Sequence, residues 1–520
     1  MNFSRTEEFD VEDLLLAELQ QPRLVRRGMA CVAPGGVFWS LRKKSCRIAL
    51  TLVTALALVL EAKAQTSLRE FALSPQSLPS PRTKAIGLNA NGTLLVLGGL
   101  PLKGNKSLVD ELASDGSWSE VEQLPDNKEG LGVGIDALGR VIVFGGIVPF
   151  TTTPVTAGFV YTAKNGPGEA IASKHFAVYN FAFATDGWGR VYSIGGALTS
   201  GFPLALSGGV ERYDASTDTW TTLAPMPSPR TKATAVFDGL GHILVFGGID
   251  ANSTVTTTVF SYDVEIDAWT QLADVPLALT GPINDGAAVL GADGLIYLVG
   301  PGSSVFDPVL KVWFPGPALQ VIRGAPATAL GSDGFIYVMG GVNTSVHGDF
   351  LDTVERLDTA SPALPSIFST PPKTLHLGAK LSYQIIASGH PRPSYSVVNG
   401  PPAMSVEAST GLVTWTPAAD EAGSHSVTVR ASSSAGAIDQ SFTISVIVDQ
   451  PVLSRVLLPQ AEGLRLSGGG TPGFTYGIEA SPDLAIWSRI GNCLADGTGQ
   501  FQFTDATTGN STRFYRVVFP

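Results

Sequence analysis

Short apolar segments bounded by glycine recur through the first two thirds of the chain. In six places a turn glycine is followed by five residues with an apolar core and then by a second glycine, and the first glycines are Gly92, Gly139, Gly189, Gly241, Gly294 and Gly334. Most of the enclosed residues are β-branched, aliphatic or aromatic, and Asn or Asp stands shortly before most of the turns. This pattern predicts β-hairpins.

The six segments recur at intervals of 40 to 53 residues, which predicts four-stranded units that bury their faces against neighbouring units. The later part of three units contains an aromatic-Asp pair and a tryptophan seven residues after the aromatic residue: Tyr213 with Trp220, Tyr262 with Trp269 and Phe306 with Trp313. We expect these rings to pack between blades rather than to stack on a ligand. The pattern resembles the kelch repeat, and the resemblance implies a six-bladed β-propeller over residues 66–361.

The two ends of the repeat region predict how the ring closes. The sixth unit reaches Val354–Asp358 but has no tryptophan strand after it. Residues 80–85, Ser-Pro-Arg-Thr-Lys-Ala, are identical to residues 228–233, which follow such a strand. An N-terminal strand within residues 66–78 should therefore pair with the sixth unit and remove the open sheet edges.

Residues after the repeats predict two further β domains, which makes the expected fold class all-β. Residues 362–372 are proline-rich and indicate a linker. Residues 373–449 alternate apolar and polar positions as sandwich strands do, and they resemble immunoglobulin-like modules of bacterial surface proteins. Residues 451–520 predict a C-terminal β module, which resembles a small module of large exported bacterial proteins.

The first 64 residues predict a targeting segment. Basic residues at 42–47 precede an uncharged apolar run at 48–60, and Ala62-Lys63-Ala64 provides a cleavage site, so residues 1–64 are expected to be an N-terminal extension and signal peptide, cleaved after Ala64. Thirteen residues are too few to span a bilayer stably, although an uncleaved anchor is the alternative. Met29 is an alternative start to Met1. We expect a secreted or cell-envelope protein with no membrane span in the mature chain.

Charge and missing motifs narrow the function. The net charge is −11 and no basic stripe is present, which argues against nucleic acid as a partner. After cleavage only Cys493 remains, so no intramolecular disulfide is possible. Copper oxidases of the galactose-oxidase type share the layout of a kelch ring and an immunoglobulin-like domain, but their cofactor needs a propeller cysteine. We expect no cofactor, no metal and no catalytic residue.

The candidate site follows from the alternating direction of the strands in a blade, which we call strand parity. Residues before the first strand of a unit lie on the same face as the loop after its Gly-Gly pair. Four cations, Arg82, Lys128, Arg230 and Arg323, stand 16 or 17 residues before the first glycine of the Gly-Gly pair of their units. Loop residues expected beside them are Asp250, Asn252, Asn343, His347 and Asp349. This set is predicted to bind a carboxylate or an acidic sugar at the channel mouth. In the alternative, each cation caps its own blade by bonding loop carbonyls.

These features predict an exported, non-catalytic protein that binds a glycan or an extracellular protein on one propeller face. The alternative is a carbohydrate-active enzyme of the sugar-mutarotase or oxidase kind, with its site at the same channel mouth.

Overall fold

The computed structural model describes residues 69–101, 108–124, 128–148, 151–162, 166–200, 204–276, 287–344, 348–418, 420–460, 463–506 and 513–519. Every regular element in these ranges is a β-strand, which confirms the all-β class. In the same ranges no helix is long and apolar enough to cross a membrane. The predicted signal segment and His347 lie outside the described residues.

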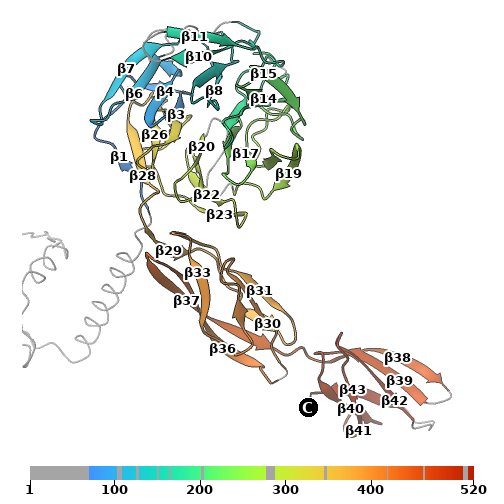
Figure 1. Cartoon of the computed structure of the whole chain (residues 1–520). Helices are drawn as coiled ribbons and strands as arrows, with labels where there is room; N and C mark the ends of the chain where they lie inside the picture. Colours follow the sequence, from blue (N-terminus) through green and yellow to red (C-terminus); the bar gives the residue numbers. More distant parts are fainter. Residues whose placement is uncertain are drawn as a thin grey trace, which may run out of the picture. The chain divides into compact units, whose positions relative to one another are not determined.

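Six four-stranded antiparallel sheets form between residues 72 and 358 of the described chain, and they follow one another around a ring (Figure 1). We number them blades 1 to 6. Blade 1 contains β3 (Ile86–Ala90), β4 (Thr93–Leu97), β6 (Leu108–Leu112) and β7 (Trp118–Gln123). Blade 2 contains β8 (Gly132–Ile135), β9 (Val141–Phe144), β10 (Gly158–Thr162) and β11 (Gly166–Ile171). Blade 3 contains β12 (Ala182–Thr185), β13 (Val191–Ile194), β14 (Val210–Asp214) and β15 (Thr219–Leu223).

The remaining blades follow the same order. Blade 4 contains β16 (Thr234–Phe237), β17 (His242–Phe246), β18 (Val259–Asp263) and β19 (Ala268–Leu272). Blade 5 contains β20 (Ala287–Leu290), β21 (Ile296–Val299), β22 (Ser303–Asp307) and β23 (Val312–Pro315). Blade 6 contains β25 (Ala327–Leu330), β26 (Phe335–Met339), β28 (Val354–Asp358) and β1 (Ala72–Leu73). The first strands of successive blades contact one another, including β25 with β3, so the ring is closed and the β-propeller is confirmed.

The N-terminal strand closes blade 6 as the sequence predicted. Strand β1 pairs with β28 in antiparallel register, with Ala72 opposite Arg356 and Leu73 opposite Glu355. Phe71, directly before β1, is buried in the core between blades 5 and 6. The first and last parts of the repeat region are therefore joined by both hydrogen bonds and apolar packing.

The tryptophans pack between blades. Trp220 lies opposite Tyr213 in its own blade, with 5.3 Å between the ring centroids. Its indole N–H also donates to the carbonyl oxygen of Ala172 in blade 2, at 2.9 Å. Trp269 repeats this arrangement with a 2.9 Å bond to Ala224 of blade 3. Each such ring adds buried area and a satisfied polar contact at a blade junction.

Two short strand pairs lie beside the first strands of blades 1 and 6. They are β2 (Arg82–Thr83) with β5 (Leu100–Pro101), and β24 (Arg323–Gly324) with β27 (Val342–Asn343). Both pairs bring the residues before the first strand to the loop after the Gly-Gly pair. This geometry agrees with the parity argument made from the sequence.

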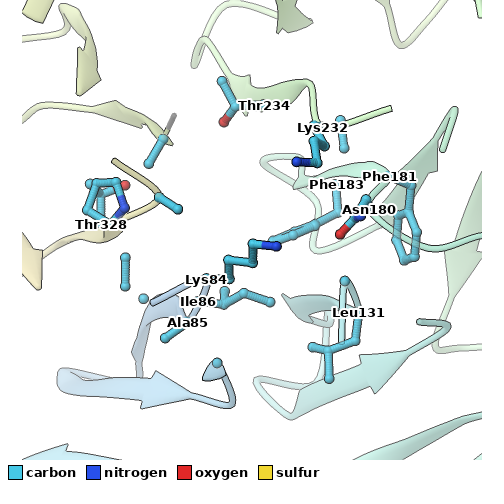
Figure 2. A pocket seen from close by; sticks show the side chains of 18 of the residues that line it. Lys84, Ala85, Ile86, Leu131, Asn180, Phe181, Phe183, Lys232, Thr234 and Thr328 are labelled. Carbon is cyan, nitrogen blue, oxygen red and sulfur yellow. The ribbon is translucent and has the colours of Figure 1, made fainter. Parts of the chain in front are cut away.

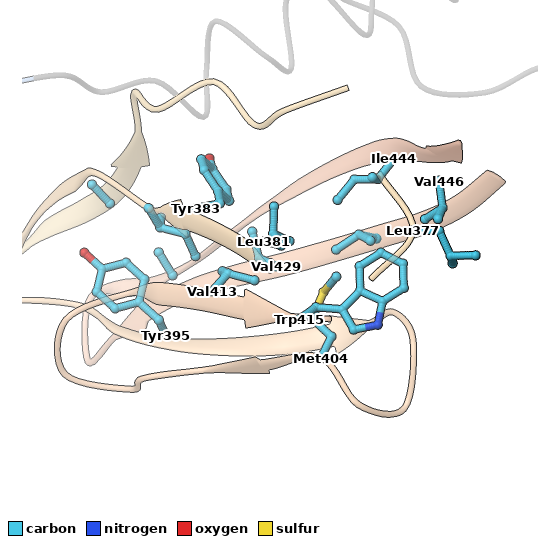
Figure 3. Packing of buried hydrophobic residues seen from close by; sticks show 14 residues of the cluster. Leu377, Leu381, Tyr383, Tyr395, Met404, Val413, Trp415, Val429, Ile444 and Val446 are labelled. Carbon is cyan, nitrogen blue, oxygen red and sulfur yellow. The ribbon is translucent and has the colours of Figure 1, made fainter. Parts of the chain in front are cut away.

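A two-sheet sandwich follows the propeller. One sheet has the order β30 (Thr374–His376), β37 (Gly436–Ile447), β36 (Gly423–Ser433), β33 (Ser394–Asn399), and the other β31 (Leu381–Gln384), β35 (Leu412–Trp415), β34 (Ser405–Val406). Figure 3 shows the core between them, in which Trp415 is the largest buried side chain. A further pair joins β29 (Ala363–Ile367) to β32 (Ala387–His390). Strand β29 lies inside the segment 362–372 that the sequence indicated as a linker.

The C-terminal module has two three-stranded sheets around a small core. Their strands are β38 (Val452–Gln460), β39 (Gly463–Gly469) and β42 (Gln500–Asp505) in one, and β41 (Ser488–Leu494), β40 (Thr475–Ser481) and β43 (Phe514–Val518) in the other. Cys493 is a free thiol in this core, next to Tyr476.

Candidate functional site

Three of the four predicted cations are buried inside their own blades. The exposed fractions of Arg82, Arg230 and Arg323 are 1%, 2% and 0%. Arg323 donates to the carbonyl oxygens of Gly340 and Thr353, each at 2.9 Å, and forms a 2.5 Å ion pair with Glu355. Bonds to loop carbonyls are what the capping alternative requires. We therefore assign these arginines to blade capping, because each guanidinium group already forms hydrogen bonds within its own blade.

The partner of the capping cation comes from one position of the third strand. In blade 1 it is Asp110, which pairs with Arg82 at 2.5 Å, and in blade 6 it is Glu355. Blade 4 has Phe260 there, and the guanidinium carbon of Arg230 lies 4.7 Å from the centroid of its ring. A cation–π contact thus takes the place of an ion pair, while Arg230 also donates to the carbonyl of Gly247 at 2.9 Å.

In blade 3 the buried cation is Lys174, which the sequence analysis missed, and Glu211 occupies the partner position of the third strand. Lys174 is buried, with its amine 3.0 Å from the Ser193 hydroxyl and 3.5 Å from Glu211. The amine also lies 4.7 Å from the centroid of the Phe181 ring. Burial lowers the pKa of Lys174 to about 8, although the carboxylate of Glu211 opposes the shift.

The other predicted residues are separated by the structure. Lys128 is half-buried and lines the central cavity. Asp250 accepts the backbone N–H groups of Asn252 and Thr254, at 2.9 and 2.8 Å, so its carboxylate closes its own turn. The backbone N–H of Asn343 donates to the carbonyl of Asp349 at 2.9 Å. Of the predicted residues that the structure describes, Lys128 alone lines this cavity.

A cavity of about 230 Å³ occupies the mouth of the central channel. Residues at and just before the starts of the first strands line it, and most of them are alanine, glycine, threonine, leucine or phenylalanine. Figure 2 shows the amino groups of Lys84 and Lys232 directed toward the middle of this space, with the Asn180 amide beside them. Lys128 and Glu129 complete the charged part of the lining.

One backbone position in five blades explains how these side chains reach the cavity. It lies two residues before the first strand and has a positive φ: 56° at Lys84, 57° at Gly130, 49° at Asn180, 56° at Lys232 and 47° at Ala325. The corresponding sequence position of blade 5, Asp285, lies outside the described residues. A left-handed residue turns the chain sharply between the loop and the strand, so its side chain emerges at the channel mouth.

Backbone hydrogen bonds connect these left-handed residues from blade to blade. Lys84 donates its N–H to the carbonyl of Ala325 at 3.0 Å, across the join between blades 1 and 6. Asn180 donates to Gly130 at 2.9 Å, and Lys232 donates to Asn180 at 2.8 Å. Because these carbonyl oxygens accept bonds within the ring, they contribute less negative potential to the mouth. The lysine amines are then the main charged donors in the cavity.

The lining of this cavity is chemically suited to an anion. Several ammonium groups with an amide beside them suit a carboxylate, which accepts charge-assisted hydrogen bonds. Among the described residues, no group of three or more His, Cys, Asp or Glu side chains is arranged to hold a metal ion.

The sequence contained a signal for Lys84 and Lys232. Both lie in the identical segments 80–85 and 228–233, two residues after the arginines that we singled out. The alternating strand directions placed these segments on the correct face of the propeller. They could not show whether the arginine or the lysine of each segment points into the channel. An acidic residue directly after the first valine of the third strand, as at Glu211 and Glu355, would have identified the buried partner of the cation.

Comparisons with known proteins agree with this architecture. The family model described as Kelch motif matches residues 232–276, and the one described as Putative Ig domain matches residues 363–447. Beta-scruin of Limulus polyphemus is 31% identical over 150 residues, which are 26% of this chain and 16% of that protein. The human Kelch repeat and BTB domain-containing protein 13 is 28% identical over 247 residues, 47% of this chain and 49% of that protein.

The chain thus spans less than half of the length of these relatives. Among solved structures, a fungal alcohol oxidase of the AA5 family in complex with copper is 16% identical, with a TM-score of 0.41. That match covers 73% of this chain and all of the oxidase chain.

Proposed function

We propose that this chain, a kelch-repeat protein with an immunoglobulin-like domain, is an exported, non-catalytic binding protein that holds an anionic group of its ligand in the channel mouth. The observation that carries the proposal is the convergence of Lys84, Lys128 and Lys232, from blades 1, 2 and 4, on one cavity. Like charges converge at a cost, which Glu129 in the same lining reduces and a bound anion would offset further.

The size of the cavity favours a binding role. Sites that enclose a whole small molecule commonly measure about 300–1,000 Å³. A volume of about 230 Å³ fits one acidic end group better than an entire substrate. The rest of the ligand would then lie on the loops around the mouth. The kelch-repeat relatives support a protein as the ligand, and an acidic glycan is the second class that the same chemistry admits.

Export of the protein is part of the same proposal. It is supported by the basic residues at 42–47, the apolar run at 48–60 and the Ala62-Lys63-Ala64 site. An extracellular ligand follows from that location.

Calorimetric titration of the purified protein tests the proposed function. The probes are a glutamate-rich peptide and an oligosaccharide of uronic acids, each at low and high salt. We expect one probe to bind with salt-sensitive affinity, and Lys84→Ala or Lys232→Ala to weaken it at least tenfold, about 1.4 kcal/mol. Lys311→Ala is the matched control, because Lys311, like Lys84, is an exposed lysine with a positive φ, 57°, but lies in the outer turn of blade 5.

Two results would contradict the proposal. One is an affinity that the cavity substitutions leave unchanged. The other is conversion of the sugar probe to a new product, which would favour the enzyme alternative.

A further inference from the structure

The face opposite the lysine mouth carries an unusual set of exposed apolar residues. Each blade connects its first two strands there by a tight turn, and in three consecutive blades the tip of that turn is Leu138, Trp188 or Leu240. Their exposed fractions are 65%, 53% and 55%. The same position holds Asn91, Asp293 and Asp333 in blades 1, 5 and 6. The apolar tips are therefore confined to blades 2, 3 and 4.

The three tips belong to turns that touch one another. A Cβ atom on Gly189, next to Trp188, would lie 2.5 Å from the backbone of Ala137, next to Leu138. A Cβ atom on Gly187 would lie 3.4 Å from the ring of Phe237, the last strand residue before the turn of blade 4. Since neighbouring turns are packed this closely, their tips form one surface rather than scattered residues.

Ile266 extends this surface onto the outer turn of blade 4. It is 71% exposed, and the neighbouring Val264 donates its N–H to the carbonyl of Gly241 at 3.1 Å. That bond ties the outer turn to the inner turn that carries Leu240. We refer to Leu138, Trp188, Leu240 and Ile266 as the apolar turn patch.

Trp188 is held in place before any partner arrives. The guanidinium carbon of Arg190 lies 4.7 Å from the centroid of its ring, and Arg190 in turn donates to Asp186 at 2.6 Å. A tryptophan that is already ordered loses little entropy on binding, which is a property of strong interface anchors.

Polar groups within the inner turns are already satisfied, which disfavours a sugar as the occupant. Asp186 accepts the backbone N–H groups of Trp188 and Arg190, at 2.9 and 3.0 Å, and also the hydroxyl of Tyr192 at 2.9 Å. Asp136 is used in the same way by Leu138 and Arg140. A sugar needs hydrogen-bonding groups from its site, whereas these turns offer mainly apolar tips.

Charge around the patch indicates which kind of protein fits it. The inner-turn arginines are paired with their own aspartates, so these pairs are close to neutral. The outer turns of blades 3 and 4 carry five carboxylates: Asp214, Asp218, Asp263, Glu265 and Asp267. Hydrogen bonds from Ser216 lower the pKa of Asp214, and the N–H of Glu265 lowers that of Asp263, which keeps both ionised.

We propose that the apolar turn patch is a docking surface for a protein segment that carries aliphatic or aromatic side chains flanked by lysine or arginine. The apolar side chains of the partner would cover Trp188 and its neighbours, and the basic groups would face the outer-turn carboxylates. This surface is separate from the lysine mouth, so the proposal stands independently of the ligand proposed there.

Fluorescence anisotropy with three labelled peptides tests this proposal. The probes are a ten-residue peptide of alternating lysine and leucine, one of lysine and serine, and one of glutamate and leucine. We expect the lysine-leucine peptide to bind tightest. The triple variant Leu138→Ser, Trp188→Ser, Leu240→Ser should weaken that binding at least tenfold. The control Val148→Ser, Leu198→Ser removes exposed apolar residues from the mouth-side loops and should leave it unchanged.

Thermal melting of both variants checks that the propeller remains folded. If the triple variant is unfolded, Trp188→Ser alone replaces it, with at least a threefold loss expected. Equal binding by the glutamate-leucine peptide would overturn the proposal, as would an unchanged affinity in the folded variants. A neutral oligosaccharide whose binding requires Trp188 would instead assign the patch to sugars. Self-association in ultracentrifugation that the triple variant abolishes would assign it to a second copy of this chain.

Discussion

The guanidinium carbon of Arg230 lies 4.7 Å from the centroid of the Phe260 ring, at the strand position where blade 6 places Glu355 against Arg323. The register confirms the equivalence, because Phe260 is opposite Val245 and Glu355 is opposite Val338, each one residue before the end of the second strand. Equivalent buried arginines of two blades are thus stabilised differently, Arg230 by an aromatic ring and Arg323 by a carboxylate.

Loss of the ion pair and loss of the cation–π contact should lower the free energy of unfolding by different amounts. Glu355→Gln leaves the charge of Arg323 buried without its counter-ion, and such losses cost about 3–5 kcal/mol. Phe260→Leu removes a cation–π contact and little volume, for about 1–2 kcal/mol. Chemical denaturation of both variants gives the two free energies of unfolding. A larger loss in Phe260→Leu than in Glu355→Gln would show that the ion pair is not the stronger support.

Ring closure can be tested by truncation. A chain that begins at Leu78 lacks β1 and Phe71, so it exposes the edge of β28 and empties part of the core between blades 5 and 6. We expect a lower melting temperature and a less cooperative transition than in a chain that begins at Gln65. Phe71→Ala should reproduce much of the loss, about 3–5 kcal/mol. An identical melting curve for the two chains would refute the role of β1.

Lys174 predicts a pH dependence of stability with a definite sign. Its folded-state pKa is lowered to about 8 from the ordinary lysine value of 10.5, mainly by burial. The unfolded chain then binds more protons than the folded one between these values, so the contribution of Lys174 to stability rises with pH through that window. Each unit of pKa difference corresponds to about 1.4 kcal/mol.

The comparison is between the protein and Lys174→Met, by urea denaturation at several pH values from 7.5 to 10. The free energy of unfolding of the unsubstituted protein should rise relative to that of the variant as pH increases. Stopping at pH 10 avoids the buried tyrosines, such as Tyr161 with its pKa raised to about 12 by burial. Parallel profiles would mean that Lys174 does not titrate differently in the folded state.

The repeat pattern contained most of the fold. Six glycine-bounded strands, the spaced tryptophans and the shared segment 80–85 were sufficient for the propeller and for its closure by the N-terminal strand. They were sufficient because blade packing is periodic in sequence. The first strand of the sandwich was missed, since the prolines around Ala363–Ile367 indicated a linker rather than the strand pair that β29 forms with β32.

The site was harder to predict from the sequence than the fold, because neighbouring residues in one segment have different roles. Arg82 and Lys84 differ in role only because the chain adopts a left-handed conformation at Lys84, and a single sequence does not reveal that φ. Lys174 was missed for another reason: it reaches the buried position from a loop outside the repeat register. The use of Lys174 in place of an arginine depends on tertiary geometry rather than on sequence spacing.

The most direct test of the central claim compares two residues of one segment, Arg230 and Lys232. Arg230→Ala and Lys232→Ala are each measured for melting temperature and for affinity toward the anionic probe that binds the unsubstituted protein. We expect Arg230→Ala to lower the melting temperature by several degrees, and Lys232→Ala to weaken binding at least tenfold with little change in melting. The opposite pattern, lost affinity with normal melting in Arg230→Ala and intact affinity in Lys232→Ala, would contradict the assignment of the cap and the ligand site.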